Sequence, residues 1–125
     1  MLHEHHWSIE DANAMLPWVG ARLRRMRGAR DRLARDGQLA SMAAAAVTAG
    51  GWWPGREAAE AALELVFGFE ELGRLEIVVR DLDAGLVDFP ALRGGEEVYL
   101  CWLLDEPAVT HWHAVEAGFL GRQQL

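Results

Sequence analysis

The spacing of apolar residues predicts two helices followed by a small sheet. From Ile9 to Leu33, apolar side chains recur every three or four positions, which places them on one stripe of an amphipathic helix. Ser8 is a suitable N-cap for this helix, and Gly37 is a typical stop. We therefore expect a first helix over residues 8–37.

A second apolar helix is expected over residues 57–73. Its apolar positions cover more of the helix circumference than one partner helix needs, which predicts contacts on two sides. The intervening residues 38–56 are rich in Ala, Gly and Trp and are expected to form a variable loop. Trp52 and Trp53 in this loop are costly to leave in water. We expect them either to cover the core or, with the second helix, to form a homodimer contact.

The C-terminal half changes to the period-two pattern of strands. Residues 75–80, 86–89 and 98–104 are rich in β-branched and aromatic residues between turn signals, and residues 109–113 are a candidate fourth strand. The third strand is apolar on both faces, which is typical of the middle of a sheet. The pattern predicts an α+β fold in which a long two-helix antiparallel hairpin packs on a small three- to four-stranded antiparallel sheet. Residues 74–125 would hold the sheet and a C-terminal tail.

Composition favours a single domain spanning residues 1–125. The chain has 125 residues, of which 51% are hydrophobic, enough for one core. A formal net charge of −7 argues against nucleic-acid or anionic-membrane partners. The basic stretch from Arg22 to Arg35 is interpreted as a solvated face paired with acidic neighbours. Because Cys101 is the single cysteine and no secretory pattern opens the chain, we expect a cytoplasmic location.

The first seven residues hold three histidines and are expected to form a mobile tail. His3 is placed to join a free amino terminus in a square-planar copper or nickel site. Such histidine-rich tails are more often incidental.

His111 and His113 are the strongest candidate metal ligands. Residues two apart on a strand share a face, so the two imidazoles are spaced to bind one zinc or iron ion. Glu106 and Asp83 are possible oxygen donors, and Cys101 is either a buried hydrophobe or a thiolate ligand. The alternative is that both histidines are partly buried hydrogen-bonding residues at a strand end.

Asp88 is expected in a buried strand, where a carboxylate needs a partner. Arg122 or His113 would supply that partner, and the pair would tie the C-terminal tail to the sheet. Together, Asp88, Arg122 and Trp112 are candidates for holding a small anionic ligand. No complete phosphate-binding, dinucleotide-binding or nucleophile-elbow motif occurs in the chain.

Distinctive motifs lie at both ends of the chain: SIEDANAMLPWV (8–19), DLDAGLVDFP (81–90), VYLCW (98–102), the Glu-Pro turn and the later WH, AGF and GR. In these motifs the chain resembles a bacterial family catalogued as domain of unknown function 2203. The positions that match are Asp81, Asp83, Gly85, Asp88, Pro90, Cys101, Trp102, Glu106, Trp112, His113, Gly118 and Arg122. In that family the position of His111 is more often aromatic, so the resemblance shifts weight to His113 with Glu106 and the aspartates. It implies a shared fold and brings no established activity.

Three functions follow as expectations. The leading one is binding of a divalent metal, zinc or iron, or of a small anionic ligand at the polar cluster of the C-terminal sheet. The second is a homodimeric interaction module in which that cluster is only structural. The third is a metal-dependent hydrolase.

Overall fold

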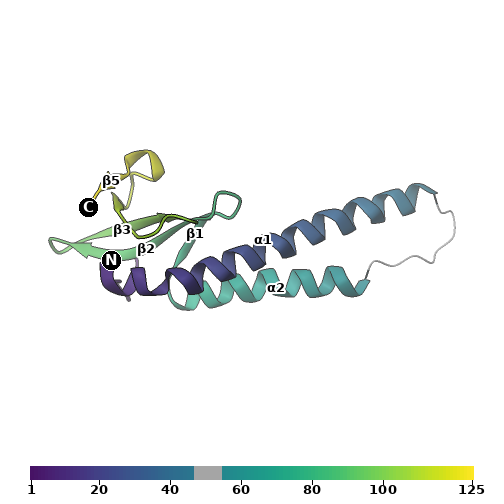
Figure 1. Cartoon of the computed structure of the whole chain (residues 1–125), viewed down its shortest axis with the longest axis horizontal. Coiled ribbons are helices and arrows are strands. Elements are labelled where there is room, and N and C mark those ends of the chain that lie inside the picture. The colour runs from purple at the N-terminus through teal and green to yellow at the C-terminus, as the bar shows by residue number, and fades with distance from the viewer. Residues whose placement is uncertain (47–54) are drawn as a thin grey trace.

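The computed structural model describes the backbone of residues 1–46 and 55–125, and the side chains of these residues apart from Asp36 and residues 38–46. The predicted contact through Trp52 and Trp53 lies outside the described residues. Two helices and five strands make up the fold (Figure 1).

The first helix, α1, spans Ile9–Ala46. It starts as predicted, because the Ser8 hydroxyl accepts the Asp11 N–H at 3.0 Å. The predicted stop at Gly37 was wrong. A glycine ends a helix by adopting a positive φ, and Gly37 is not among the residues that do so. The Ala-rich sequence that follows has high helix propensity and continues the helix.

The second helix, α2, spans Gly55–Arg74 and runs antiparallel beside α1 (Figure 1). Gly68 permits this close approach, since a Cβ there would lie 2.5 Å from Met26 Sδ. The sheet covers the beginning of α1 and the end of α2, and the rest of the helical hairpin extends beyond it (Figure 1). Neither helix, as far as the chain is described, is long and apolar enough to cross a membrane.

The sheet is an antiparallel meander in which each strand pairs with the next along the chain. Its strands are β1 (Val78–Asp81), β2 (Leu86–Arg93), β3 (Glu96–Leu103), β4 (His111–Ala114) and β5 (Gln123–Gln124). The predicted α+β fold with a helical hairpin on a small sheet is therefore confirmed. The fifth strand, formed by the C-terminal tail, had no strand-like pattern in the sequence.

β2 continues past Pro90, where the sequence predicted its end. Pro90 lies opposite Tyr99 of β3, and β1 pairs with β2 only as far as Asp88. The Pro90 carbonyl accepts the Trp7 N–H at 2.6 Å, so this edge of β2 meets the N-terminal segment in place of β1. Proline is tolerated here because no neighbouring strand needs the N–H that it lacks.

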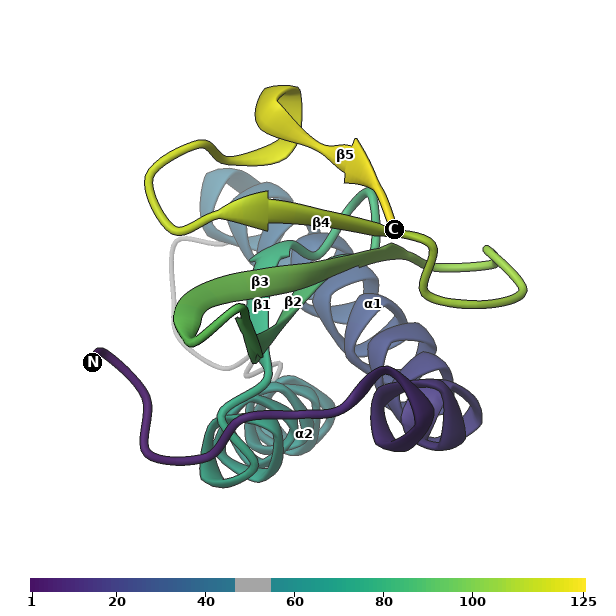
Figure 2. The same cartoon turned by 90° about the vertical axis from the view of Figure 1, so that its left-hand side faces the viewer.

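The two faces of the sheet have different neighbours (Figure 2). One face packs on the helices and forms the hydrophobic core. Buried core residues of the sheet include Val87, Phe89, Leu100 and Trp102, and those of α1 include Leu16, Val19, Leu23 and Met26. The C-terminal segment with the short 3-10 helix η1 (Phe119–Gly121) lies on the side farthest from α2 (Figure 2).

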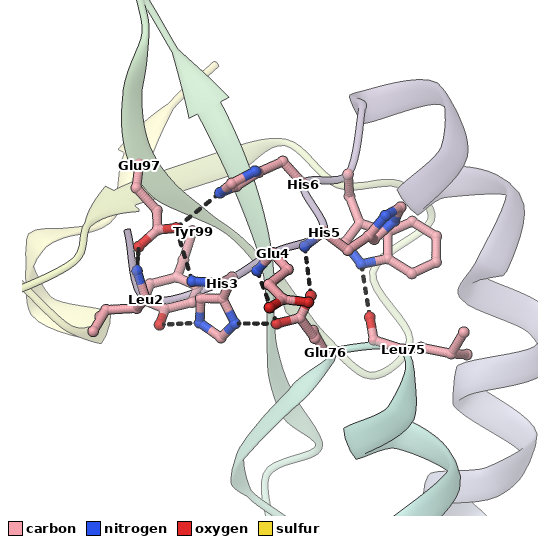
Figure 3. Close-up of polar contacts among 10 residues, drawn as sticks. Leu2, His3, Glu4, His5, His6, Leu75, Glu76, Glu97 and Tyr99 are labelled. Carbon is pink, nitrogen blue, oxygen red and sulfur yellow. Dashed lines mark hydrogen bonds and ion pairs between the residues drawn. The ribbon is translucent and has the colours of Figure 1, made fainter.

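The N-terminal segment is held by hydrogen bonds, which corrects the prediction of a mobile tail (Figure 3). Two carboxylates, of Glu97 in β3 and Glu76 in the turn before β1, accept its backbone N–H groups. Those donors are the amides of Leu2 (2.8 Å) and His3 (3.1 Å) toward Glu97, and of Glu4 (3.2 Å) and His5 (2.6 Å) toward Glu76. The sequence did not reveal this arrangement because both glutamates are far from the segment along the chain.

Side chains of the same segment reinforce these contacts. His6 Nε2 lies 2.8 Å from Glu97 Oε2, and the His3 ring lies 2.7 Å from the Tyr99 hydroxyl (Figure 3). Trp7 donates its indole N–H to the Leu75 carbonyl at 3.1 Å. The His3 amide, which a terminal copper site would use, already donates to Glu97.

Candidate functional site

Asp88, Cys101 and His113 come together on the sheet face that points away from the helices. Asp88 on β2 lies directly opposite Cys101 on β3. His113 on β4 lies opposite Tyr99, two residues before Cys101. Because side chains alternate between faces along a strand, all three project to one side. We call this group the Asp88–Cys101–His113 cluster.

The cluster is buried and closely spaced. Asp88, Cys101 and His113 are each no more than 2% exposed. One potential ligand atom from each residue lies within 4.8 Å of the other two. A carboxylate, a thiol and an imidazole therefore share one small volume that water scarcely reaches.

Asp88 has two partners through one oxygen and none through the other. Its Oδ2 accepts from Arg80 Nε at 2.8 Å and lies 3.0 Å from His113 Nε2. Its Oδ1 is buried and has no hydrogen-bond partner among the described residues. The neutral Cys101 thiol also acts on the Asp88 carboxylate as a hydrogen-bonding neighbour. Because buried carboxylate oxygens are normally paired, Oδ1 is a candidate contact for a bound cation.

The His113 ring is oriented by its backbone. Nδ1 lies 2.8 Å from the Ala114 carbonyl oxygen, while Nε2 faces Asp88. Both neighbours are acceptors, so an imidazolium satisfies both contacts. A neutral ring that keeps its proton on Nδ1 would instead present the Nε2 lone pair to the cluster, the state that a metal requires.

Cys101 is held as a neutral thiol. Burial, together with the nearby negative charge of Asp88, raises the pKa of the Cys101 thiol to about 11, although Arg122 acts in the opposite direction. The thiolate would therefore form only with a positive charge beside it, and this environment does not favour an independent nucleophile.

A pocket of about 260 Å³ opens beside the cluster. The sheet forms one side of the pocket, and the C-terminal segment from Val115 to Phe119, the first residue of η1, forms the other side. The lining residues are Arg80, Leu86, Asp88, Cys101, His113, Val115, Glu116, Gly118 and Phe119. A small ligand thus has access to the region of the unpaired Asp88 oxygen.

Glu106 and Arg122, two further predicted site residues, pair with each other. Arg122 Nη2 donates to Glu106 Oε1 at 2.6 Å, and the same oxygen accepts the Leu103 N–H at 2.7 Å. Glu106 thereby closes the turn after β3 and fastens the C-terminal segment. The Arg122 Nε is buried without a partner among the described residues. The predicted pairing of Asp88 with a C-terminal residue is made by His113, not by Arg122.

The remaining predicted site residues lie elsewhere. The Asp83 side chain is 80% exposed and pairs with Arg30 of α1. His111 lies opposite Cys101 in the register, but its Nδ1 contacts Thr110 Oγ1 at 2.8 Å and the ring is not in the cluster. Trp112 points to the other face of the sheet and packs against the core.

Arg80 is a site residue that the sequence did not single out. The register between β1 and β2 shifts between Val79 and Asp81, which is a β-bulge at Arg80. Its guanidinium carbon lies 4.9 Å from the centre of the Tyr99 ring while its Nε reaches Asp88. Alternation along β1 places Arg80 on the same face as Asp88, because Val79 beside it packs on the core. An arginine near the end of an apolar strand was the available signal, and its pairing with Asp88 depends on a strand register that the sequence does not show.

Comparisons with known proteins give a family and no closer relative. No curated protein matches the chain, and neither does any solved structure. A family model described as "Uncharacterized conserved protein (DUF2203)" matches residues 5–125, which include the whole sheet and the cluster. The chain therefore belongs to the family of domain of unknown function 2203.

Proposed function

We propose that this protein binds a divalent metal ion, zinc by preference, through Asp88, Cys101 and His113. The observation that carries the proposal is the buried Asp88 Oδ1, which lacks a partner among the described residues and lies within a cluster of three ligand-type side chains. A bound cation would supply a partner for Oδ1, while Arg80 keeps its contact with Oδ2.

The donor set favours zinc over harder ions. One sulfur, one imidazole nitrogen and one carboxylate oxygen suit zinc, whereas magnesium and calcium prefer oxygen ligands alone. Tetrahedral zinc keeps its donors about 3.3–3.8 Å apart, and the three side chains already bring one ligand atom each within 4.8 Å of the others. The hydrogen bond from His113 Nδ1 to the Ala114 carbonyl would orient the ring, as is usual for metal-bound histidines.

An anionic ligand fits the same pocket less well. Asp88 and Glu116 both line the pocket and repel a negative charge, and the one arginine in the lining, Arg80, is already paired with Asp88. Arg122, the cation predicted to attract an anion, is paired with Glu106 and is mostly buried. A cation is therefore the better complement to the pocket.

Three protein ligands leave one coordination position for water or a substrate, facing the pocket. This is the arrangement of catalytic zinc sites, whereas structural zinc sites use four protein ligands. A metal-dependent hydrolase is the enzymatic form of the same proposal, and a cytoplasmic location agrees with a reduced Cys101. The alternative, an interaction module with a purely structural cluster, predicts no metal at all.

Zinc stoichiometry in paired histidine variants tests the proposal. Purified full-length protein should bind about one zinc per chain in a calorimetric titration, and His113→Ala should bind none at the same concentrations. His111→Ala is the matched control, because His111 is two residues away on β4 and lies outside the cluster. It should keep wild-type stoichiometry.

A substoichiometric titration of the wild type would overturn the proposal, as would equal binding by both variants. Thermal melts of the metal-free proteins would show whether His113→Ala still folds. If that variant is unfolded, Cys101→Ser provides the same comparison with a smaller change in volume.

A further inference from the structure

Tyr99 is buried between the N-terminal segment and the Asp88–Cys101–His113 cluster. It is 4% exposed, although it lies on the outer face of the sheet, two residues before Cys101, and is not part of the hydrophobic core cluster. Its hydroxyl lies 2.7 Å from His3 Nε2 (Figure 3), and its ring centre lies 5.5 Å from that of His113. One side chain therefore contacts both the N-terminal segment and a proposed metal ligand.

Arg80 connects Tyr99 to Asp88. Its guanidinium carbon lies 4.9 Å from the centre of the Tyr99 ring, within cation–π range, and its Nε donates to Asp88 Oδ2 at 2.8 Å. Burial is the largest single effect on the pKa of Arg80 and lowers it, but the hydrogen bond and charge of Asp88, with a smaller contribution from the Tyr99 hydroxyl, raise the pKa overall. Because Arg80 occupies Oδ2, Oδ1 is the Asp88 oxygen left for the proposed metal ion.

Glu76 fixes the other side of the His3 imidazole. His3 Nδ1 lies 3.3 Å from Glu76 Oε1, so a ring with its proton on Nδ1 accepts the Tyr99 hydroxyl at Nε2 (Figure 3). Glu76 has a φ of 57° in the turn that ends α2, a position where glycine is usual. A glutamate there is less favourable than glycine for the turn itself, so its presence points to the contacts that its carboxylate makes.

We propose that the N-terminal segment positions the metal site, with His3 acting through Tyr99 and Arg80 on Asp88. This inference rests on the proposed binding of zinc by the cluster. His3 does not touch the metal ion. It is a positioning residue that holds the Tyr99 ring, and the ring holds the Arg80 guanidinium against Asp88 Oδ2. By thermodynamic linkage, zinc binding and docking of the N-terminal segment stabilise each other.

The zinc affinity of His3 variants tests this positioning role. In competition with a chromogenic chelator, full-length His3→Ala should bind zinc about tenfold more weakly than the wild type, the lower end of the losses usual for residues that orient metal ligands. His3→Gln should bind nearly as tightly as the wild type, because its amide reaches the Tyr99 hydroxyl from the same position. His5→Ala is the matched control and should keep wild-type affinity, since His5 is exposed and its ring contacts Trp7. Unchanged affinity in His3→Ala, no recovery in His3→Gln, or an equal loss in His5→Ala would each overturn the proposal.

Tyr99→Phe tests the route between His3 and the cluster. It removes the hydroxyl and keeps the ring, so it should weaken zinc binding by about the same factor as His3→Ala. In the Tyr99→Phe background, His3→Ala should cause no further loss, because both changes break the same hydrogen bond. Additive losses would refute the assignment of Tyr99 as the link.

Hydrogen exchange measures the reciprocal effect of zinc on the N-terminal segment. Saturating zinc should slow exchange of the Leu2 and His3 amides, which donate to Glu97, in the wild type and not in Tyr99→Phe. Exchange that zinc does not alter in the wild type would contradict the coupling. A wild type that binds no zinc would overturn the proposed function together with this inference, whereas unchanged affinity in His3→Ala overturns the inference alone.

Discussion

At the scale of single residues, the site depends on the Asp88 carboxylate. One of its oxygens is satisfied by Arg80 and His113, and the other is buried without a partner among the described residues. Leaving a buried acceptor unpaired destabilises a fold by about 1–3 kcal/mol. Unpaired buried acceptors are therefore uncommon unless the group has a further role. The proposed zinc ion gives that oxygen a use.

The affinity for zinc should depend steeply on pH. Burial and the Asp88 charge raise the pKa of the Cys101 thiol to about 11, so zinc must displace the thiol proton at every pH near neutrality. The apparent association constant should therefore rise by about tenfold per pH unit as the pH is raised from neutrality toward the pKa of the thiol. Competition with a chromogenic chelator at several pH values measures it.

Cys101→Ser provides the comparison for this pH dependence. It removes the thiol proton, so any residual zinc binding should show a shallower slope with pH. A wild-type affinity that does not change with pH would show that the thiolate is not a ligand.

The sequence predicted Cys101 and His113 as candidate metal ligands and Asp88 as a ligand-binding residue of the same polar cluster, and the structure brings these three together. Their types and their positions on strands were sufficient for that. It misplaced Asp83 and Glu106, because turn residues carry no face preference and their partners, Arg30 and Arg122, are distant along the chain. It missed Arg80 because the alternation places this side chain on the outer face but does not say that β2, with Asp88, is the neighbouring strand.

At the scale of elements, the N-terminal segment is fixed to the sheet by acceptors that the sequence could not pair with it. Glu97 accepts from the Leu2 and His3 amides and contacts the His6 ring. The hydrogen bond with His6 is the largest of the effects that lower the pKa of Glu97 from its usual 4.5 to about 2. Burial, the second-largest effect, acts in the opposite direction, and the hydrogen bonds from the two amides lower the pKa further.

This depressed pKa predicts acid lability. The unfolded chain binds a proton at Glu97 near pH 4.5, whereas the folded chain binds it only near pH 2. The stabilisation from Glu97 is therefore complete above pH 4.5 and is lost as the pH falls from 4.5 to about 2. Urea unfolding followed by circular dichroism across this range should show a shallower pH dependence for Glu97→Gln than for the wild type.

Glu96→Gln is the control for that experiment, because Glu96 is the preceding residue of β3 and its side chain is exposed. It should keep the wild-type pH dependence. Identical slopes for the wild type and Glu97→Gln would contradict the assignment of acid lability to the N-terminal segment.

The ends of α1 and β2 depend on tertiary contacts and backbone conformations that local sequence patterns do not reveal. α1 passes Gly37 because glycine stops a helix only in the left-handed conformation, which composition does not reveal. β2 continues past Pro90 because β1 does not extend along this edge of β2. No strand there needs the N–H that proline lacks. The periodicity predicted both elements, and their ends depended on distant neighbours.

At the scale of the whole molecule, the two faces of the sheet have different roles. Its inner face packs on the helical hairpin and holds the core, while its outer face carries the cluster beneath the C-terminal segment.

Anomalous diffraction from crystals grown with zinc tests the central claim most directly. Data collected on both sides of the zinc absorption edge locate the ion without reference to activity. The account predicts one strong peak per chain, about 2.0–2.3 Å from Asp88 Oδ1, Cys101 Sγ and His113 Nε2. No peak at the cluster, or a peak only at surface groups such as the N-terminal histidines, would contradict it.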